Sequence, residues 1–372
     1  MSKKPSILAI SLGGTLFMAS SDDNIKSAQV LGDRYYVFSD FPKVEQIVEP
    51  KFVELSSIDS SNLQRDDWKK VAEYIIAHKD KYDGFVVLQG TDTLAYSASA
   101  LSFALLGLNK PVVLTGAQKG KDDIGSDAQN NVINAFQVAA LRHKGQPALK
   151  EVVIVFGTKL IKGTRARKYS ERDLESFDTV NTPLLGRIRL QVKIKRNLVL
   201  HETKESEEFG INFNSGVNML YIYPGIDPKI VLQVGQNSSA LILAAFGAGN
   251  IPCTESNLPN NPYSLEKVVA TLTRQNIPVV ITTQCVTGQA EFSMYEAGHA
   301  ARNAGAIIAN DMTPETAYVK MSWILANEQF WPNDAKRAAR GGPGWLEGVK
   351  KAMISNMVGE ITENPVLNSC WE

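Results

Sequence analysis

Short segments that contain an uninterrupted apolar run alternate with helical patterns along the N-terminal half of the chain, and this alternation constrains the fold most strongly. The apolar segments are residues 6–11, 85–88, 111–116 and 151–157. Strands without a polar face are typical of a parallel sheet that helices cover on both sides. Right-handed crossover helices then join neighbouring strands. The pattern therefore predicts a doubly wound, mostly parallel α/β sheet.

The segments between these strands have the composition of covering helices. Residues 66–78 place their apolar side chains on one helical face, and residues 94–106 are rich in Ala and Leu, as in a mostly buried helix. Ser126 or Asp127 could cap a further helix that runs to about Leu141. These helices would supply the crossovers between the strands.

A second alternation of the same kind follows a polar segment. Its predicted strands are 217–223, 240–246, 278–284 and 306–310, and its predicted helices are 294–304 and one that begins at Thr313-Pro314. Residues 200–216 are polar and charged without a core pattern, so they are predicted to be a linker. We therefore expect two α/β domains, a larger one over residues 1–199 and a smaller one over residues 217–372.

Charge, hydropathy and cysteine usage exclude several classes of function. Lys and Arg together number 39, as do Asp and Glu, so the chain lacks the excess positive charge on which nucleic-acid affinity depends. Its apolar runs are shorter than the roughly 18 residues that a membrane span needs. The 3 cysteines are widely spaced without a CxxC pair, which indicates neither a disulfide framework nor a zinc site. We expect no nucleic-acid partner, no membrane and no metal.

Polar residues gather where the predicted strands of the N-terminal domain end. These ends read Gly13-Gly14-Thr15, Gln89-Gly90-Thr91-Asp92-Thr93 and Thr115-Gly116-Ala117-Gln118. The carboxyl ends of parallel strands meet at one edge of the sheet, where doubly wound folds bind ligands. Thr91 and Asp92 could instead be ordinary helix caps. The glycines before Thr15 could form a phosphate loop, although the sequence lacks GxGxxG and a Lys-Ser/Thr pair.

Two hydroxyls and one carboxylate at the same edge are consistent with acyl transfer through a threonine nucleophile, without fixing the substrate.

Lys3 and Lys4, followed by an apolar stretch, can also be interpreted as a secretory signal peptide. Cleavage would remove Gly14 and Thr15 from the predicted site. With the sparse cysteines, a reducing cytoplasm is the favoured location.

Several motifs, in order, resemble the bacterial-type L-asparaginase/glutaminase family. They are "LGGTL", "QGTDTL", "VVLTGAQ", "DDIGSDAQNNVINA", "GAGNIP" and "GHAARNAGAIIANDMTPETAYVKM". The resemblance runs from Ile7 to about Leu325; "GGT" alone is unspecific, but its combination with "GTDT" and "GAGN" is highly specific. The form "DSSN" at residues 59–62 is more similar to the cytoplasmic, type I branch.

The resemblance implies an L-asparagine amidohydrolase with a larger N-terminal and a smaller C-terminal α/β domain. An enzyme of mixed glutaminase and asparaginase specificity is the alternative within the family. Neither a metal nor an organic cofactor is implied. The family forms homodimers or homotetramers, in which each site lies between the N-terminal domain of one subunit and the C-terminal domain of its neighbour.

The same resemblance assigns roles to the catalytic residues. Thr15 matches the nucleophile, Thr91 the second catalytic threonine and Lys168 the catalytic lysine, which could act as a base. Asp92 matches the carboxylate that completes this set and binds the α-ammonium group of the substrate. Thr93 is expected to be a helix cap only.

The remaining site residues would bind the substrate. Ser60 matches the serine that holds the α-carboxylate of the substrate, with Asp59 and Ser61 on either side of it. Backbone N–H groups near Gly14 and Gly90 are the expected oxyanion donors. Ala117 would line the side of the site that holds the substrate amide, and Asn250 would reach in from the partner subunit. Tyr35, or else Tyr36, would close over the nucleophile.

Two other classes of function share this pair of domains. One is a glutamyl-tRNA amidotransferase subunit, which carries a further domain ahead of the "GGT" motif. The other is a non-catalytic protein that binds an amino acid. The joint presence of Thr15, Ser60, Thr91, Asp92 and Lys168 favours an enzyme over the binding protein.

Overall fold

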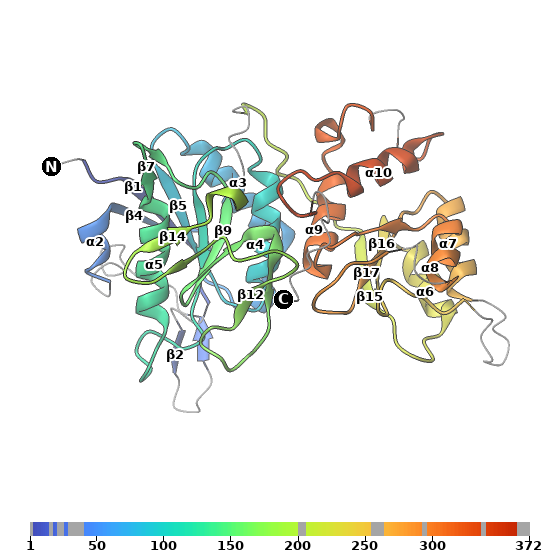
Figure 1. Ribbon diagram of the computed structural model, residues 1–372, viewed down its shortest axis with the longest axis horizontal. Helices are drawn as coiled ribbons and strands as arrows, with labels where there is room; N and C mark the ends of the chain where they lie inside the picture. Colours follow the sequence, from blue (N-terminus) through green and yellow to red (C-terminus); the bar gives the residue numbers. More distant parts are fainter. Residues whose placement is uncertain are drawn as a thin grey trace. The chain divides into compact units, whose positions relative to one another are not determined.

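A computed structural model describes residues 3–14, 18–20, 26–28, 41–199, 206–253, 264–291, 296–335 and 340–362 (Figure 1). The chain consists of two compact units, Met1–Ile211 and Asn212–Glu372. The point of division lies within the segment 200–216 that the sequence predicts to be a linker. Within the described residues, no helix combines the length and apolar character that crossing a bilayer requires.

The first unit is built on an eight-stranded sheet with the strand order β14-β13-β10-β9-β6-β5-β1-β4. The strands are β1 (Ser6–Ser11), β4 (Glu49–Glu54), β5 (Gly84–Leu88), β6 (Val112–Thr115), β9 (Val152–Phe156), β10 (Lys159–Lys162), β13 (Gly186–Ile188) and β14 (Val192–Ile194). The run from β4 to β9 is parallel throughout. This part confirms the predicted doubly wound α/β fold.

The other end of the sheet is antiparallel. β10 pairs with β9 and with β13, and β13 pairs with β14. These strands are only three or four residues long, and two of the three residues of β14 are half-buried while the third is exposed. The sequence did not predict them, because strands this short carry no clear alternation of apolar and polar residues.

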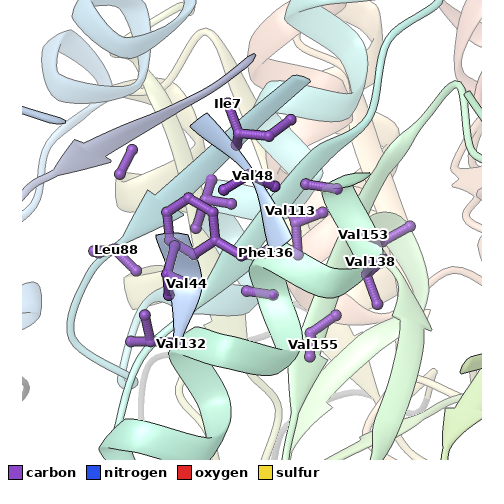
Figure 2. Packing of buried hydrophobic residues seen from close by; sticks show 14 of the residues in the cluster. Ile7, Val44, Val48, Leu88, Val113, Val132, Phe136, Val138, Val153 and Val155 are labelled. Atoms are coloured by element: carbon purple, nitrogen blue, oxygen red, sulfur yellow. The ribbon is translucent and has the colours of Figure 1, made fainter. Parts of the chain in front are cut away.

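Helices cover both faces of this sheet. α2 (Val44–Ile47) and α5 (Ala128–Ala140) lie on one face, where their apolar residues form a single core cluster with strand residues such as Ile7 and Val113. Figure 2 shows Phe136 of α5 at the centre of this cluster. Successive strand residues point to opposite faces, so the equally buried Leu8 and Leu114 face the other side. That side carries α4 (Leu94–Ala104), which packs against β9, and α3 (Arg65–Ala77), which packs against α4.

The second unit has a smaller, fully parallel sheet in the order β15-β16-β17-β18. Its strands are β15 (Val217–Tyr221), β16 (Ala240–Ala245), β17 (Val279–Thr283) and β18 (Ile307–Ile308). Its helices are α6 (Pro228–Gln236), α7 (Leu265–Arg274), α8 (Glu296–Asn303), α9 (Pro314–Ile324) and α10 (Trp345–Ile354). α9 begins as predicted, with the Thr313 hydroxyl accepting from the Thr316 N–H at 3.1 Å and Pro314 in the first turn.

Candidate active site

Glycines at the ends of neighbouring strands allow these ends to lie directly against one another. Gly14 follows β1 with φ of +91°, and a Cβ atom placed on it would lie 2.2 Å from the backbone nitrogen of Gly90. A Cβ atom on Gly90 would lie 2.6 Å from Oγ of Ser60. One on Gly116, after β6, would lie 2.3 Å from the carbonyl oxygen of Gln89. Because a side chain fits at none of these three positions, the strand ends form one closely packed edge.

Lys168 joins the two polar side chains that follow β5. Its Nζ lies 2.7 Å from Oγ1 of Thr91 and 2.7 Å from Oδ1 of Asp92. β11 (Ala166–Lys168), which pairs in antiparallel fashion with β12 (Phe177–Thr179), brings the lysine back to this edge. The side chain of Lys168 is 20% exposed and that of Asp92 is 62% exposed. The ammonium group is therefore shielded, whereas a ligand in solution can reach the carboxylate.

Gln118 also forms a hydrogen bond with the hydroxyl of Thr91. Oγ1 of Thr91 donates to Oε1 of Gln118 at 3.0 Å while it accepts from Lys168. A lysine ammonium group can only donate and an amide oxygen can only accept, so the Thr91 proton points toward Gln118 and an oxygen lone pair points toward Lys168. Nε2 of Gln118 donates to the carbonyl oxygens of Glu171 at 3.1 Å and Asp173 at 3.4 Å, which fixes the orientation of the amide.

The backbone of Gln118 is fixed by the start of α5. The carboxylate of Asp127 accepts from the N–H groups of Gln118, at 3.0 Å, and of Lys119, also at 3.0 Å. Nδ2 of Asn131 donates to this carboxylate and to the carbonyl oxygen of Gly116, both at 2.9 Å. Asp127, one of the two residues predicted to cap this helix, stands at the N-cap position, but its side chain makes no capping bond to the helix. It positions the loop after β6 instead.

Ser60 lies buried beside the end of β5. Its Oγ accepts from the backbone N–H of Asp92 at 3.3 Å, and its carbonyl oxygen accepts from Oγ1 of Thr93 at 2.9 Å. The expectation that Thr93 serves only as a helix cap is therefore wrong. Thr93 occupies the N-cap position of α4, but its side chain makes no capping bond and holds the loop of Ser60 in place.

Asp59 begins the short 3₁₀ helix Ser60–Asn62. Its Oδ1 accepts from the hydroxyl of Ser61 at 2.6 Å and from the N–H of the same residue at 2.8 Å. These bonds, the hydroxyl first, hold the pKa of Asp59 below its ordinary value, while partial burial opposes them. Asp59 thus remains a carboxylate next to the candidate substrate-binding serine.

Four predicted residues remain, two of them within the described part of the chain. Ala117 is buried in the loop between Gly116 and Gln118. Asn250 belongs to the second unit, in a tight turn after β16 where residues 246 and 250 form an antiparallel bridge. Its Oδ1 is buried and has no hydrogen-bond partner within the described part of the chain. Thr15 and Tyr35, with the alternative Tyr36, lie outside the described residues.

The structure thus gathers Ser60, Thr91, Asp92 and Lys168 at one sheet edge, next to Gly14 and Gly90. Gln118 was not predicted to take part. The one available signal was its place at the end of β6, beside the strand that leads to Thr91. For metal binding, no suitable group of three or more His, Cys, Asp or Glu side chains occurs among the described residues.

Comparison with known proteins gives matches along nearly the whole chain. The family model "Asparaginase, N-terminal" matches residues 6–200, and "Glutaminase/Asparaginase C-terminal domain" matches residues 216–338. The chain is 32% identical to L-asparaginase 1 of Escherichia coli, over 97% of this chain and 99% of that protein. It is 30% identical to a glutamyl-tRNA(Gln) amidotransferase subunit of Saccharolobus solfataricus, over 88% of this chain and 70% of that one. The crystal structure of L-asparaginase I from Vibrio cholerae has a TM-score of 0.78 and 32% identity, over 97% of this chain and 100% of the other.

Proposed function

The chain belongs to the asparaginase family, and from this premise we propose that it is an L-asparagine amidohydrolase, which converts L-asparagine and water to L-aspartate and ammonia. Enzymes of this family are hydrolases that act on amide bonds. One observation carries the proposal: Lys168 lies 2.7 Å from both Thr91 and Asp92 at the sheet edge that also holds Gly14. Gly14 directly precedes the proposed nucleophile, Thr15.

The residues around this cluster suit an amino acid whose two ends are charged. Asp92 presents a largely exposed carboxylate that can pair with the α-ammonium group of the substrate. The Ser60 hydroxyl accepts from the N–H of Asp92, so its own proton can be donated to the α-carboxylate. Asp59 and Ser61 hold the turn that carries Ser60. Binding both charged ends fixes the side-chain amide in one position, which lowers the entropic part of the barrier.

Hydrolysis would proceed in two steps through a covalent ester on Thr15. In the first, the hydroxyl oxygen of Thr15 bonds to the amide carbon, the C–N bond breaks, and ammonia leaves with the proton that Thr15 gave up. In the second, water attacks the ester carbon, a proton returns to the Thr15 oxygen, and L-aspartate is released. Backbone N–H groups near Gly14 and Gly90 would stabilise the oxyanion of each step, a type of contact typically worth about a hundred- to thousandfold in rate. Ala117 would line the amide side.

We assign proton handling to Thr91 and Lys168. Lys168 donates to Thr91 and Asp92 in the resting arrangement, so it must lose a proton before it can act as a base through Thr91. Gln118 holds the Thr91 hydroxyl with its lone pair toward Lys168, which keeps the two groups in contact. We therefore propose Gln118 as a positioning residue for this pair.

Further parts of the proposal concern the setting of the enzyme. We propose a cytoplasmic homodimer or homotetramer, in which Asn250 of one subunit reaches the site of its neighbour and Tyr35 closes over Thr15. We propose that the catalytic motifs belong to a domain of residues 1–199 and that 200–216 is a linker. The match to the family model "Glutaminase/Asparaginase C-terminal domain" favours one alternative, an enzyme of mixed specificity that also hydrolyses L-glutamine.

The test is ammonia release from L-asparagine and, separately, L-glutamine by the purified protein and two variants. Thr15→Ala removes the proposed nucleophile, and Thr271→Ala, the matched control, removes a threonine hydroxyl that bonds within its own helix, α7. We expect release from L-asparagine that disappears in Thr15→Ala and persists in Thr271→Ala. Full activity in Thr15→Ala would overturn the nucleophile assignment. A folded protein that L-asparagine stabilises against heat, but that releases no ammonia from either amide, would identify a binding protein.

A further inference from the structure

A cavity of about 660 Å³ lies at the sheet edge opposite to the candidate active site. It is lined in part by the hairpin of β7 (Arg142–His143) and β8 (Gln146–Pro147), which connects α5 to the start of β9. Nη2 of Arg142 lies 3.5 Å from the carbonyl oxygen of Asp83, just before β5 begins. Thr91 follows the other end of β5, so this cavity and the strand-end site are separate.

The lining combines positive charge with an apolar surface. Its basic side chains are Arg142, His143, Lys144, Lys150 and Arg196. Val192 and Ile194 of β14 contribute the apolar surface and pack against the main core cluster. Neither Asp nor Glu is found among the described residues that line the cavity, although Oδ1 of Asp83 lies 4.0 Å from Nη2 of Arg142. In a chain with 39 basic and 39 acidic residues, such a separation of charge favours an anionic ligand.

The backbone of the hairpin and the guanidinium group of Arg142 are held in place. Lys144 and Gly145 have φ of +50° and +81°, as in the tight two-residue turns of β-hairpins, and this turn fixes His143 opposite Gln146. Nη1 of Arg142 donates to the carbonyl oxygens of Ala139 at 3.0 Å and Leu141 at 3.3 Å. The guanidinium group is therefore positioned before any ligand binds, and less ordering is needed on binding.

Arg196 and His143 make a contact that an anion would improve. Nη1 and Nη2 of Arg196 lie 2.9 Å and 2.8 Å from Nε2 and Nδ1 of the imidazole. A neutral imidazole accepts on only one of its nitrogens, so one of these two contacts joins a donor to a donor. Desolvation, together with the charges of Arg196 and Lys144, holds the pKa of His143 below its ordinary value. An anion bound beside Arg196 would give its guanidinium group the acceptor that one of the two imidazole nitrogens does not supply.

We propose that this cavity binds a monophosphate ester with an aromatic body, its phosphate held by Lys144 and Arg196 near the positive charge of Arg142 and its body lying on Val192 and Ile194. Several cations around one group suit the double charge of a phosphate, and the fork of an arginine matches its oxygens. The apolar strand residues suit an uncharged ring. This site is independent of the function proposed for the strand-end residues.

The experiment is calorimetric titration of the full-length protein with AMP, adenosine and inorganic phosphate. AMP carries both parts of the proposed ligand, and the other two probes carry one part each. We expect AMP to bind more tightly than either. Arg196→Ala and Lys144→Ala should each weaken AMP binding by about tenfold or more, the loss of one charge-assisted hydrogen bond. Arg274→Ala, an exposed arginine on α7, is the matched control and should leave binding unchanged.

Three outcomes would overturn the proposal. One is the absence of AMP binding, and a second is AMP binding no more tightly than phosphate alone. The third is AMP affinity that is the same in the wild type and in both variants, because the nucleotide would then bind elsewhere. If Arg196→Ala does not fold, Lys144→Ala decides alone, since that residue lies in the exposed turn of the hairpin.

Discussion

Replacing Gln118 by Met tests how the Thr91 hydroxyl is held. Met has nearly the same length and shape as Gln but offers no amide oxygen to accept from Thr91 and no N–H to donate. The variant loses the 3.0 Å bond to Thr91 and the bonds to the carbonyl oxygens of Glu171 and Asp173 at 3.1 Å and 3.4 Å. Each such bond is worth about 0.5–1.5 kcal/mol net. Since Gln118 is half-buried and water can replace part of this network, we expect a loss of about 1–2 kcal/mol in the free energy of unfolding.

The effect on catalysis follows from the freed hydroxyl. Without its acceptor, Thr91 can rotate its proton toward other groups, and the arrangement with Lys168 is populated for only part of the time. A loss of about 1–2 kcal/mol in the stabilisation of the transition state corresponds to a fall in kcat of roughly 5- to 30-fold. KM for L-asparagine should change less than about twofold, because Gln118 is not assigned a substrate contact. Steady-state ammonia release measures both constants.

Two further variants separate positioning from general stability. Gln118→Glu keeps an oxygen that accepts from Thr91 but cannot donate to the two carbonyl groups, so its stability should fall while kcat falls less than in Gln118→Met. Gln275→Met changes an exposed glutamine at the end of α7 and should leave kcat unchanged. A folded Gln118→Met variant with kcat within twofold of the wild type would refute the reasoning. Equal losses of kcat in the Met and Glu variants would also refute it, because the loop bonds would then matter rather than the acceptor.

Three other predictions concern stability. Gly14→Ala should lower the free energy of unfolding by about 2–5 kcal/mol, since its Cβ would lie 2.2 Å from the Gly90 nitrogen at a φ of +91°. Gly145→Ala is the control: its φ is +81°, but no atom lies within 4 Å of the added Cβ, so it should cost only about 1–2 kcal/mol. Equal losses in urea unfolding would contradict the close approach of the strands. Lys320→Met should cost about 3–5 kcal/mol, because it leaves the fully buried Glu360, whose Oε1 lies 2.6 Å from Nζ, without its counter-charge. Replacing Glu360 by Gln as well removes the charge but keeps an oxygen that can accept from the N–H groups of Met357 and Val358, so it should recover part of that loss. A double variant no more stable than Lys320→Met would argue against an unpaired buried charge. Ser61→Ala should raise the pKa of Asp59 toward its ordinary value. Because the pKa of Asp59 is depressed in the folded wild type, the wild type should be more stable than the variant above about pH 4. This difference in stability should shrink as the pH falls through the folded-state pKa. A difference that grows on acidification would show that Asp59 is not its source.

The parallel core of the first unit was predictable because its strands are apolar on both faces. β5 and β9 are buried at every residue, so each appears in the sequence as an uninterrupted apolar run. The start of α9 was predictable for a different reason, since the Thr313-Pro314 pair acts locally. The antiparallel strands β10, β13 and β14 depend on pairing between short segments, and pairing is not encoded in local composition.

The candidate site was predictable to the extent that it follows strand ends. Thr91 and Asp92 come directly after β5, so their place at the sheet edge follows from the parallel topology. Lys168 does not follow a strand of this core, and its role came from the resemblance to a family. Its contact with Thr91 depends on the pairing of β11 with β12. Thr93 and Asp127 stand at the predicted cap positions, yet their side chains bind other loops, which local sequence does not reveal.

The strand order explains why these separated motifs meet. β1 lies between β4 and β5, and β6 lies on the other side of β5, so four consecutive strands of the sheet end at this edge. The loops after them carry Ser60, Gly14, Thr91 and Gln118. Neighbouring parallel strands lie about 4.8 Å apart, and a side chain on a strand-end residue would normally separate their loops further. The glycines at positions 14, 90 and 116 remove that separation, so the backbone of one loop contacts the next. The "GGT", "GTDT" and "TGAQ" motifs therefore share a glycine for a structural reason that is distinct from the chemistry of their threonine, aspartate and glutamine side chains.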